Sequence, residues 1–234
     1  VNQYADGSWD EDNVATSSTH RYVSDDQIVY AGIGAAADAK CEAVGTGLGP
    51  ASGQWTFNWS AVPATAAQVT YTFFSCPAKC NTQSLGSGTS ELILTTTGMT
   101  PDCIFASQVG WSNPPSNPTT AGPMVRAFGC AIYQDSAITQ RGYSTSSVDG
   151  SGTGVVNTIC WTDRVSGQAF SGDEDYSLEV TELGVAERVG ITPRAGTDSH
   201  AFDDYIGYLA LDTGVGLHLD TVTLPTSTSE WTVS

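Results

Sequence analysis

The sequence predicts an all-β protein made of antiparallel sheets, arranged as a β-sandwich or jelly roll. Gly (25), Pro (10) and abundant Ser and Thr divide the 234-residue chain into short segments. Charged residues make up only 14% of the chain, and no long stretch has helical periodicity. Segments rich in β-branched and aromatic residues recur at intervals of about 8–12 residues, with turn signals between them.

A similar order of β segments occurs twice, which predicts two repeated units. The echoing segments are Gly53–Ser60 with Gln68–Phe74, Arg188–Pro193 with Asp204–Leu211, and Thr89–Leu94 with Thr228–Val233. We expect a partial first β-sandwich unit over residues 1–80 and a second unit over residues 89–212. Residues 219–234 are expected to supply the strand that completes the first unit, either within the chain or in a neighbouring copy, because a lone strand gains little until it joins a sheet.

In the first unit, residues 1–20 are polar and acidic and predict an irregular or weakly paired entry segment. Residues 21–23 and 27–31 are β-branched and aromatic, as strands require. Residues 35–40 have helical propensity, but the segment is too short to form a helix alone, so a turn or strand edge is expected.

Three aromatic side chains alternate with polar ones further along: Trp55, Phe57 and Trp59. This period of two places them on one face of a strand. We interpret that face as part of a sandwich core. The alternative is a platform for a sugar ring, which would require exposed rings.

Residues 76–88 are interpreted as a loop that separates the two units. The expected strands of the second unit are Glu91–Thr97, Asp102–Val109, Met124–Tyr133, Tyr143–Thr145, Val155–Thr162, Ser177–Leu183, Glu187–Thr192 and Tyr205–Leu211. A loop with four prolines, Trp111–Pro123, lies between two of them. Stiff, exposed loops of this kind often carry binding function.

The net charge of −17 argues against nucleic-acid binding, because the chain has only two lysines, Lys40 and Lys79, to release counterions from a phosphate backbone. No run approaches the roughly 18 apolar residues of a membrane-spanning helix. The first residues also lack the features of a signal peptide. A soluble protein with neither a nucleic-acid nor a membrane partner is therefore expected.

Six cysteines in a β-rich chain predict an oxidising, extracellular destination with disulfides. Six cysteines can form three disulfides in fifteen ways, and the sequence alone does not choose among them. The nearest pair in sequence, Cys76 and Cys80, flanks a tight loop that a bridge could close. A zinc site is disfavoured, because no second pair of cysteines or histidines has suitable spacing.

The sequence shows no strong catalytic motif, so we expect a non-enzymatic protein. It has no Gly-x-Ser-x-Gly turn and no phosphate-binding Gly-rich loop, although a Cys–His pair remains open. No cofactor is expected other than calcium, which suits acidic loops. The candidate ligands are Asp173, Glu174 and Asp175, although their spacing matches no specific calcium motif.

The chain also resembles a recurring β unit of structural proteins in tailed bacteriophages and prophages. The resemblance rests on Gly53–Ala64 followed by Val69–Tyr71, and on Gly98–Phe105, Phe128–Ala131 and Tyr205–Leu211. It implies one nearly complete unit over residues 98–211, preceded by part of a unit and followed by the start of a third. The segment Ile191–Gly196 departs from the pattern, because the aromatic strand is replaced there.

The resemblance implies a structural component of a virus particle, such as a capsid decoration, tail or fibre protein, that assembles with itself and other virion proteins through sheet edges. The expected assembly strand contains Thr221, Val222, Leu224, Trp231 and Val233. An extracellular carbohydrate-binding module or adhesin is the alternative. It would bind cell-surface glycans through Trp9, Trp111 and Trp161; a glycan-active enzyme ranks third.

Overall fold

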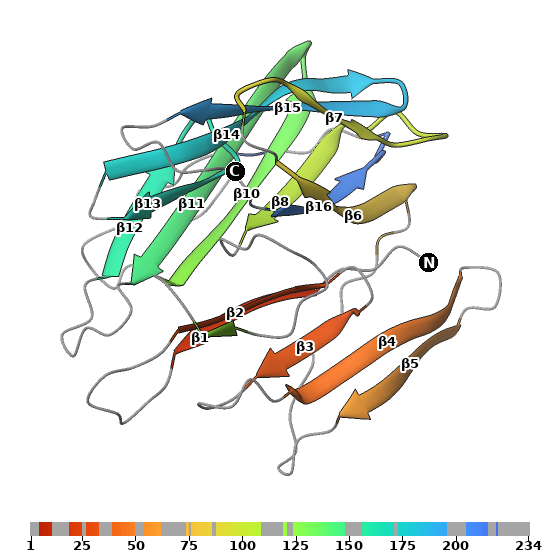
Figure 1. Cartoon of the computed structure of the whole chain (residues 1–234). Coiled ribbons are helices and arrows are strands. Elements are labelled where there is room, and N and C mark those ends of the chain that lie inside the picture. Colours follow the sequence, from red (N-terminus) through yellow and green to blue (C-terminus); the bar gives the residue numbers. More distant parts are fainter. Residues whose placement is uncertain are drawn as a thin grey trace, which may run out of the picture.

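The computed structural model describes residues 5–10, 19–24, 27–32, 39–49, 54–61, 74, 76–85, 88–108, 119–120, 124–147, 156–170, 173–195, 205–214 and 219. These residues form sixteen strands, every ladder between them is antiparallel, and they include no helix (Figure 1). The predicted all-β class is therefore confirmed. Within the same residues, no helix is long and apolar enough to cross a membrane.

The largest sheet has six strands in the order β12-β11-β10-β8-β16-β6. Their bounds are β6 Ala78–Ser84, β8 Cys103–Gln108, β10 Met124–Gln134, β11 Ala137–Ser147, β12 Val156–Trp161 and β16 Tyr205–Leu211. The sequence predicted both central strands, β8 and β10. Strand β16, which pairs with β8, comes from nearly 100 residues later in the chain, so this sheet depends on long-range pairing.

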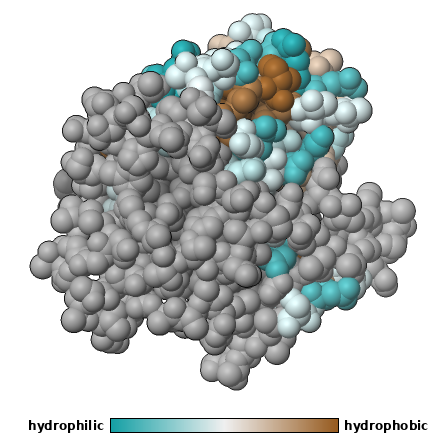
Figure 2. Space-filling view, viewed as in Figure 1, coloured by the Kyte–Doolittle hydropathy of each residue, from teal (hydrophilic) through white to brown (hydrophobic). Residues whose placement is uncertain are grey.

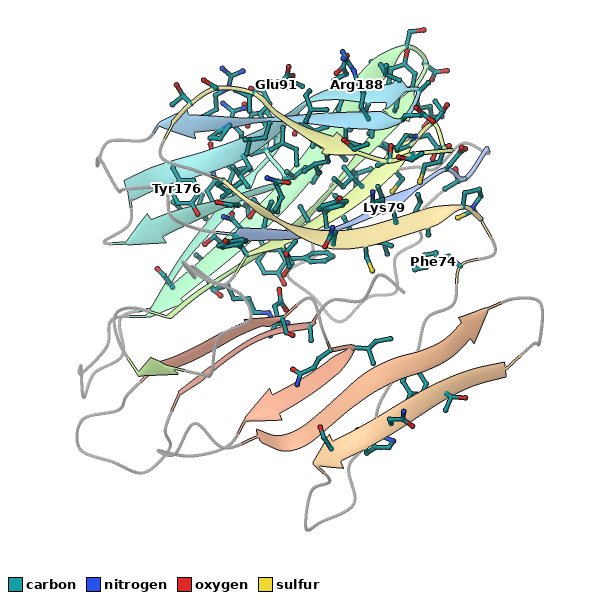
Figure 3. The ribbon with its side chains drawn as sticks, turned by 45° about the vertical axis from the view of Figure 1, so that its right-hand side comes forward. Phe74, Lys79, Glu91, Tyr176 and Arg188 are labelled. Carbon is teal, nitrogen blue, oxygen red and sulfur yellow. The ribbon has the colours of Figure 1, made fainter. Side chains whose placement is uncertain are left out.

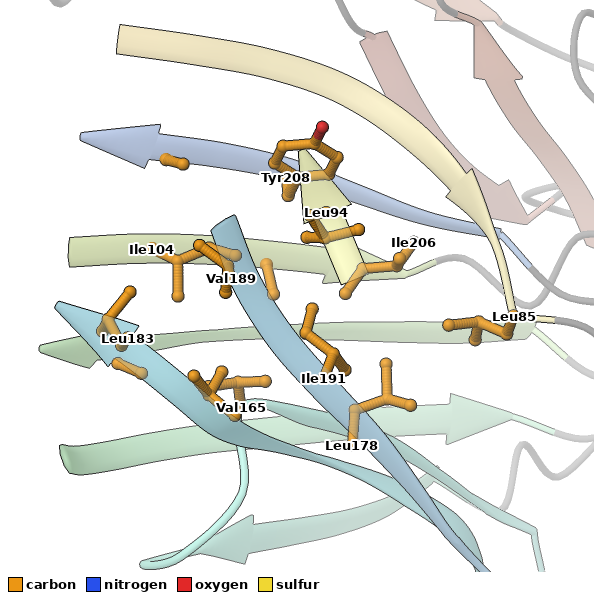
Figure 4. Close-up of a cluster of buried hydrophobic side chains, with 14 of the residues drawn as sticks. Leu85, Leu94, Ile104, Val165, Leu178, Leu183, Val189, Ile191, Ile206 and Tyr208 are labelled. Carbon is orange, nitrogen blue, oxygen red and sulfur yellow. The ribbon is translucent and has the colours of Figure 1, made fainter. Parts of the chain in front are cut away.

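A second sheet has four strands in the order β13-β14-β15-β7. Their bounds are β7 Leu92–Thr95, β13 Ser166–Phe170, β14 Asp173–Val185 and β15 Arg188–Ala195. This sheet lies over one face of the six-stranded sheet, and the main hydrophobic core fills the space between them (Figure 4).

Alternation along each strand builds this core. Ile104 and Ala106 of β8 and Ile206 of β16 are buried on the inner face of the six-stranded sheet, and Leu178 and Ile191 meet them from the four-stranded sheet. Full burial of a Leu or Ile side chain contributes about 1.5–3 kcal/mol. The core therefore holds the two sheets together through apolar contact from both sides.

Two buried polar links also join the sheets. The amide of Gln108 donates to the hydroxyl of Tyr176 and accepts from the hydroxyl of Ser166, both at 2.6 Å. The amide of Gln140 accepts from the backbone N–H of Val180 at 2.8 Å and donates to the carbonyl of the same residue at 3.3 Å. Such links satisfy polar groups that would otherwise be costly to bury.

A tight turn fixes the register of the β10–β11 hairpin. Gln134 pairs with Ala137, so the turn has two residues, Asp135 and Ser136, with φ of 52° and 65°. Two successive positive φ angles are the mark of a type I′ turn, whose twist matches that of the flanking strands. The turn therefore determines which side chains lie opposite each other along the whole hairpin.

The N-terminal strands form two smaller sheets. One has the order β1-β2-β9, with bounds β1 Ala5–Asp10, β2 Thr19–Ser24 and β9 Thr119–Thr120. The other has the order β3-β4-β5, with bounds β3 Val29–Gly32, β4 Ala39–Gly49 and β5 Gln54–Ala61. Both lie on the side of the six-stranded sheet that faces away from the four-stranded sheet (Figure 1).

The structure corrects two expectations. Residues 76–88 do not form a separating loop, because Ala78–Ser84 is an edge strand paired with β16. Its polar composition, which suits an edge, hid the strand in the sequence. The aromatic side of β5 is not fully buried either: Phe57 is half-buried and Trp59 is 40% exposed.

Candidate functional site: the outer face of the six-stranded sheet

We call the face of the six-stranded sheet that points away from the four-stranded sheet the outer face. Cross-strand partners share a face, so the pairing registers define its members. Its apolar and cysteine members are Cys80 on β6, Leu209 and Leu211 on β16, Cys103 and Phe105 on β8, Phe128, Cys130 and Ile132 on β10, Tyr143 on β11, and Cys160 on β12. Polar residues, among them Ser107, Arg126 and Arg141, share this face, so it is mixed in character.

Three aromatic rings form a row across this face. The ring centroids of Phe105 and Phe128 are 6.2 Å apart, and those of Phe128 and Tyr143 are 6.3 Å apart. These spacings fall in the range in which aromatic side chains attract each other. Phe128 is 40% exposed and Tyr143 is 43% exposed, so the row presents flat apolar surface outward.

Three cysteines meet at the end of the row. Cys103 is buried with Ile132 and Leu211, and Cys76 and Cys130 pack against this small cluster, half-buried. The sulfur atoms of Cys103 and Cys130 are 3.9 Å apart and form a hydrogen bond. We call Cys76, Cys103 and Cys130 the thiol cluster.

The sulfur–sulfur hydrogen bond makes the two thiols unequal. It raises the pKa of Cys103, which burial and the nearby Asp102 and Cys76 raise further, and it lowers the pKa of Cys130 against the opposing effect of burial. Cys130 therefore ionises first, and its thiolate then accepts the hydrogen bond from the Cys103 thiol. A thiolate is the nucleophilic form of cysteine, so Cys130 is the reactive member of the pair.

Asp102 anchors the chain beside the thiol cluster. Its carboxylate accepts hydrogen bonds from the N–H and hydroxyl of Thr213, at 2.9 and 2.7 Å, and from the N–H of Gly214 at 3.1 Å. In return, the carboxylate of Asp212 accepts from the N–H of Thr100 at 2.9 Å. These bonds fix the segment after β16 against the start of β8.

The N-terminal strands touch the outer face. The hydroxyl of Ser107, on β8, donates a hydrogen bond to the carboxylate of Asp6, on β1. Leu219 packs against the hydrophobic cluster that contains Cys103. The outer face is therefore partly covered by other parts of the same chain, while Phe128 and Tyr143 keep exposed surface.

The opposite surface of the molecule is polar. On the far side of the four-stranded sheet, Arg194 pairs with Glu179 at 2.5 Å, Arg188 pairs with Glu182, and Thr181 donates to Glu91 at 2.6 Å. Figure 3 shows Glu91 and Arg188 on this side and Tyr176 between the sheets. Exposed ion pairs contribute only about 0–1 kcal/mol each, so this is an ordinary solvated face.

The edge strands β6 and β7 lie at the same end of the two sheets. The ammonium of Lys79, on β6, donates to the carbonyl of Thr95, on β7, at 2.6 Å. Beside it, Ile93 of β7 is 43% exposed, and Figure 2 shows a hydrophobic patch at the position of this strand. Lysine on an edge discourages further strand pairing, whereas an exposed apolar edge residue favours it.

Of the tryptophans predicted to contact glycans, Trp161 is ruled out, because it is only 7% exposed. It ends β12 on the inner face, alternating with exposed Cys160, and its ring lies close to Gly167. The structure describes only the backbone of Trp9, in β1. Trp111 lies outside the described residues.

The remaining candidates are placed as follows. Neither Cys76 nor Cys80 forms a disulfide in the structure. Asp173, Glu174 and Asp175 begin strand β14 and do not form a loop, and only their backbone is described. In the part of the chain that the structure describes, no group of three or more acidic, His or Cys side chains is arranged to hold a metal. Thr221, Val222, Leu224, Trp231 and Val233 lie outside that part.

The sequence does contain a signal for the aromatic row, namely the two-residue turn of the β10–β11 hairpin, but no local alternation of residues reveals it. If Asp135 and Ser136 are the central residues of a hairpin turn, counting back along both strands places Phe128 opposite Tyr143. The pairing of β8 with β10 then adds the ring of Phe105, but no local pattern gives that register.

Comparisons with protein-family models, with curated proteins and with solved structures give no match for this chain.

Proposed function

We propose that this chain is a non-enzymatic structural component of a virus or phage particle, serving as a capsid decoration, tail or fibre protein outside cells. In this proposal the two face-to-face sheets are a jelly-roll-like β-sandwich, one of two repeated units. The partners are copies of the chain and other virion proteins, with no nucleic acid and no membrane. The observation that carries the proposal is the open edge at β6 and β7.

The edge offers a defined place for strand addition. β7 pairs only with β15 and β6 only with β16, so each has a second side free of strand partners among the described residues. Ile93 adds exposed apolar surface to that edge. Addition of a strand from a neighbouring subunit would satisfy the backbone groups and bury this side chain.

The ionisable groups around the sheets support a structural role. Asp102 and Asp212 hold two chain segments together, and Glu179 and Glu182 pair with arginines. Their contacts are explained by local stability alone.

Two substitutions with opposite expected effects test the edge. Ile93→Lys places a charge on β7 and should prevent assembly, whereas Lys79→Ala frees the Thr95 carbonyl and should promote it. Val185→Lys is the matched control, because Val185 is also exposed but lies on β14, two strands away from the β7 edge of the same sheet. Light scattering and electron microscopy of the purified chain across a concentration series measure assembly.

Assembly that is lost in Ile93→Lys and kept in Val185→Lys supports the proposal. A parent chain that stays monomeric at all concentrations, with Lys79→Ala unchanged, contradicts assembly through this edge.

The aromatic row favours a second candidate function, the binding of cell-surface glycans. Exposed, neighbouring rings such as Phe128 and Tyr143 offer apolar surface against which a sugar ring can pack. Glycan-array binding that is lost in Tyr143→Ala, with an unchanged melting temperature, would favour this function over the structural one. Tyr133→Ala is the control, since Tyr133 is also exposed but lies outside the row.

Calcium binding at Asp173, Glu174 and Asp175 is a separate proposal that rests on their charge. A rise in melting temperature on adding calcium, reversed by a chelator and absent when all three are changed to Asn or Gln, would support it.

A further inference from the structure

We propose that Cys103 and Cys130 form a disulfide bond when the protein meets an oxidising environment. This proposal concerns the folded chain itself and stands whatever the chain assembles with. It replaces the nearest pair in sequence, Cys76 and Cys80, with a pair brought together by the fold.

The first argument is the position of the two residues in the sheet. Cys103 lies opposite Ile132 and Cys130 lies opposite Phe105, so the two cysteines are diagonal neighbours on adjacent strands β8 and β10. Diagonal neighbours are on average about 7–8 Å apart, a separation that suits long side chains. The distance between the sulfur atoms must therefore show that these two short side chains meet.

The second argument is the distance. The two sulfur atoms are 3.9 Å apart. A disulfide has a sulfur–sulfur distance of about 2.05 Å, so the atoms must approach by about 1.9 Å. Bond formation therefore requires the two side chains to move closer together than they lie in the reduced protein, and the mapping experiment below tests whether they do.

The third argument excludes other pairs on the outer face. Cys160 is on β12 and is separated from β10 by β11, and Cys80 is on β6 and is separated from β8 by β16. Two strand spacings amount to about 9–10 Å, which no disulfide spans. Cys76 remains as the one competitor in the thiol cluster, and the experiment below includes it.

The reaction balances with a small-molecule disulfide such as oxidised glutathione as the oxidant. The Cys130 thiolate attacks one glutathione sulfur, forms a mixed disulfide and releases one glutathione thiolate, which takes up a proton. Cys103 then loses its proton, attacks the Cys130 sulfur and releases the second glutathione thiolate. Two electrons pass to glutathione, and two protein thiols become one disulfide.

The environment of Cys103 suits the second step. Its high pKa is due first to the hydrogen bond with Cys130. When Cys130 is held in a mixed disulfide, that sulfur no longer carries a negative charge, so the main cause of the high pKa is removed. The pKa of Cys103 therefore falls only after the first step, and its thiolate can then attack the mixed disulfide.

The test is disulfide mapping of the full chain. The protein is reduced, then incubated with excess oxidised glutathione, alkylated and digested without reductant for mass spectrometry. The expected result is one peptide pair that joins Cys103 to Cys130, with two fewer titratable thiols. A bridge from Cys76 to Cys103 or to Cys80, or a full set of thiols after oxidation, would overturn the proposal.

Matched variants make the assignment specific. Cys160→Ala should leave the bridge intact, and Cys76→Ala should also leave it intact because Cys76 takes no part in the reaction. Cys103→Ala should slow formation of the mixed disulfide at Cys130 several-fold at neutral pH, because Cys130 loses the hydrogen bond that lowers its pKa. If Cys103→Ala fails to fold, mapping of the parent chain still decides the pairing.

Discussion

Gly129 of β10 and Gly142 of β11 lie directly opposite each other on the inner face, and the backbone of Val165 fills the space that their missing side chains leave. A Cβ atom at Gly129 would collide with the carbonyl oxygen of Val165, and one at Gly142 would lie 2.7 Å from the same atom. Val165 itself is fully buried. The two glycines thus let the segment between β12 and β13 pass close against the six-stranded sheet.

This contact predicts that Gly129→Ala destabilises the protein by about 1–3 kcal/mol, because the added methyl group overpacks the site against rigid backbone. Denaturant unfolding of the purified variant measures the change. Gly88→Ala is the control, since its nearest neighbouring atom would be 3.9 Å away. Equal stability of both variants would mean that Val165 does not pack against the glycine pair.

The polar link at Gln140 yields a second prediction. Gln140→Leu leaves the N–H of Val180 buried without its hydrogen-bond acceptor and should cost about 1–3 kcal/mol. Gln134→Leu, at the exposed end of the hairpin, should change the free energy of unfolding by less than about 0.5 kcal/mol. Faster hydrogen exchange of the backbone amides around Val180 in Gln140→Leu would show that the loss of stability arises at this link.

The third prediction concerns alkaline pH. Burial, with a smaller contribution from nearby Cys80, raises the pKa of Tyr208 above its usual value of about 10. A raised folded-state pKa contributes stability that is fully present below about pH 10 and is lost as pH rises through the folded pKa. Tyr208→Phe should therefore lose less stability than the parent between about pH 9 and 11.

Unfolding curves of both proteins at a series of pH values test this expectation. Parallel loss of stability in parent and variant would show that Tyr208 titrates alike in the folded and unfolded chains.

The fourth prediction is that oxidation stabilises the protein. A bridge between cysteines 27 positions apart is expected to contribute roughly 3–4 kcal/mol by restricting the unfolded chain. The melting temperature should rise on oxidation of the parent and stay constant in the Cys103→Ala/Cys130→Ala double variant. A rise of equal size in the double variant would assign the stabilisation to other cysteines.

Segments rich in β-branched and aromatic residues, separated by turn signals, predicted most strands of the two large sheets. Nearly continuous apolar runs within residues 102–109 and 205–211 marked β8 and β16, because these strands are buried on both faces. Strand β6 was missed for the opposite reason: residues 78–84 are polar, half-buried and at an edge, so they carry no such pattern.

The candidate site could be predicted only in part. Trp161 was expected at the surface, but whether a strand residue faces inward or outward depends on register, and a shift by one position reverses it. The meeting of Cys103 with Cys130 also depends on register, in this case between strands separated by a long loop. Local sequence patterns contain no information on such pairings.

Strand β9 has a consequence for any attempt to divide this protein. The chain leaves the six-stranded sheet after Gln108, contributes Thr119 and Thr120 to the sheet of β1 and β2, and returns at Met124. A fragment that holds only the N-terminal strands lacks β9, the third strand of their own sheet. Deletion of residues 109–123 also removes β9. The N-terminal sheet includes a strand from a later segment of the chain, so the two regions have to be expressed or engineered as one piece.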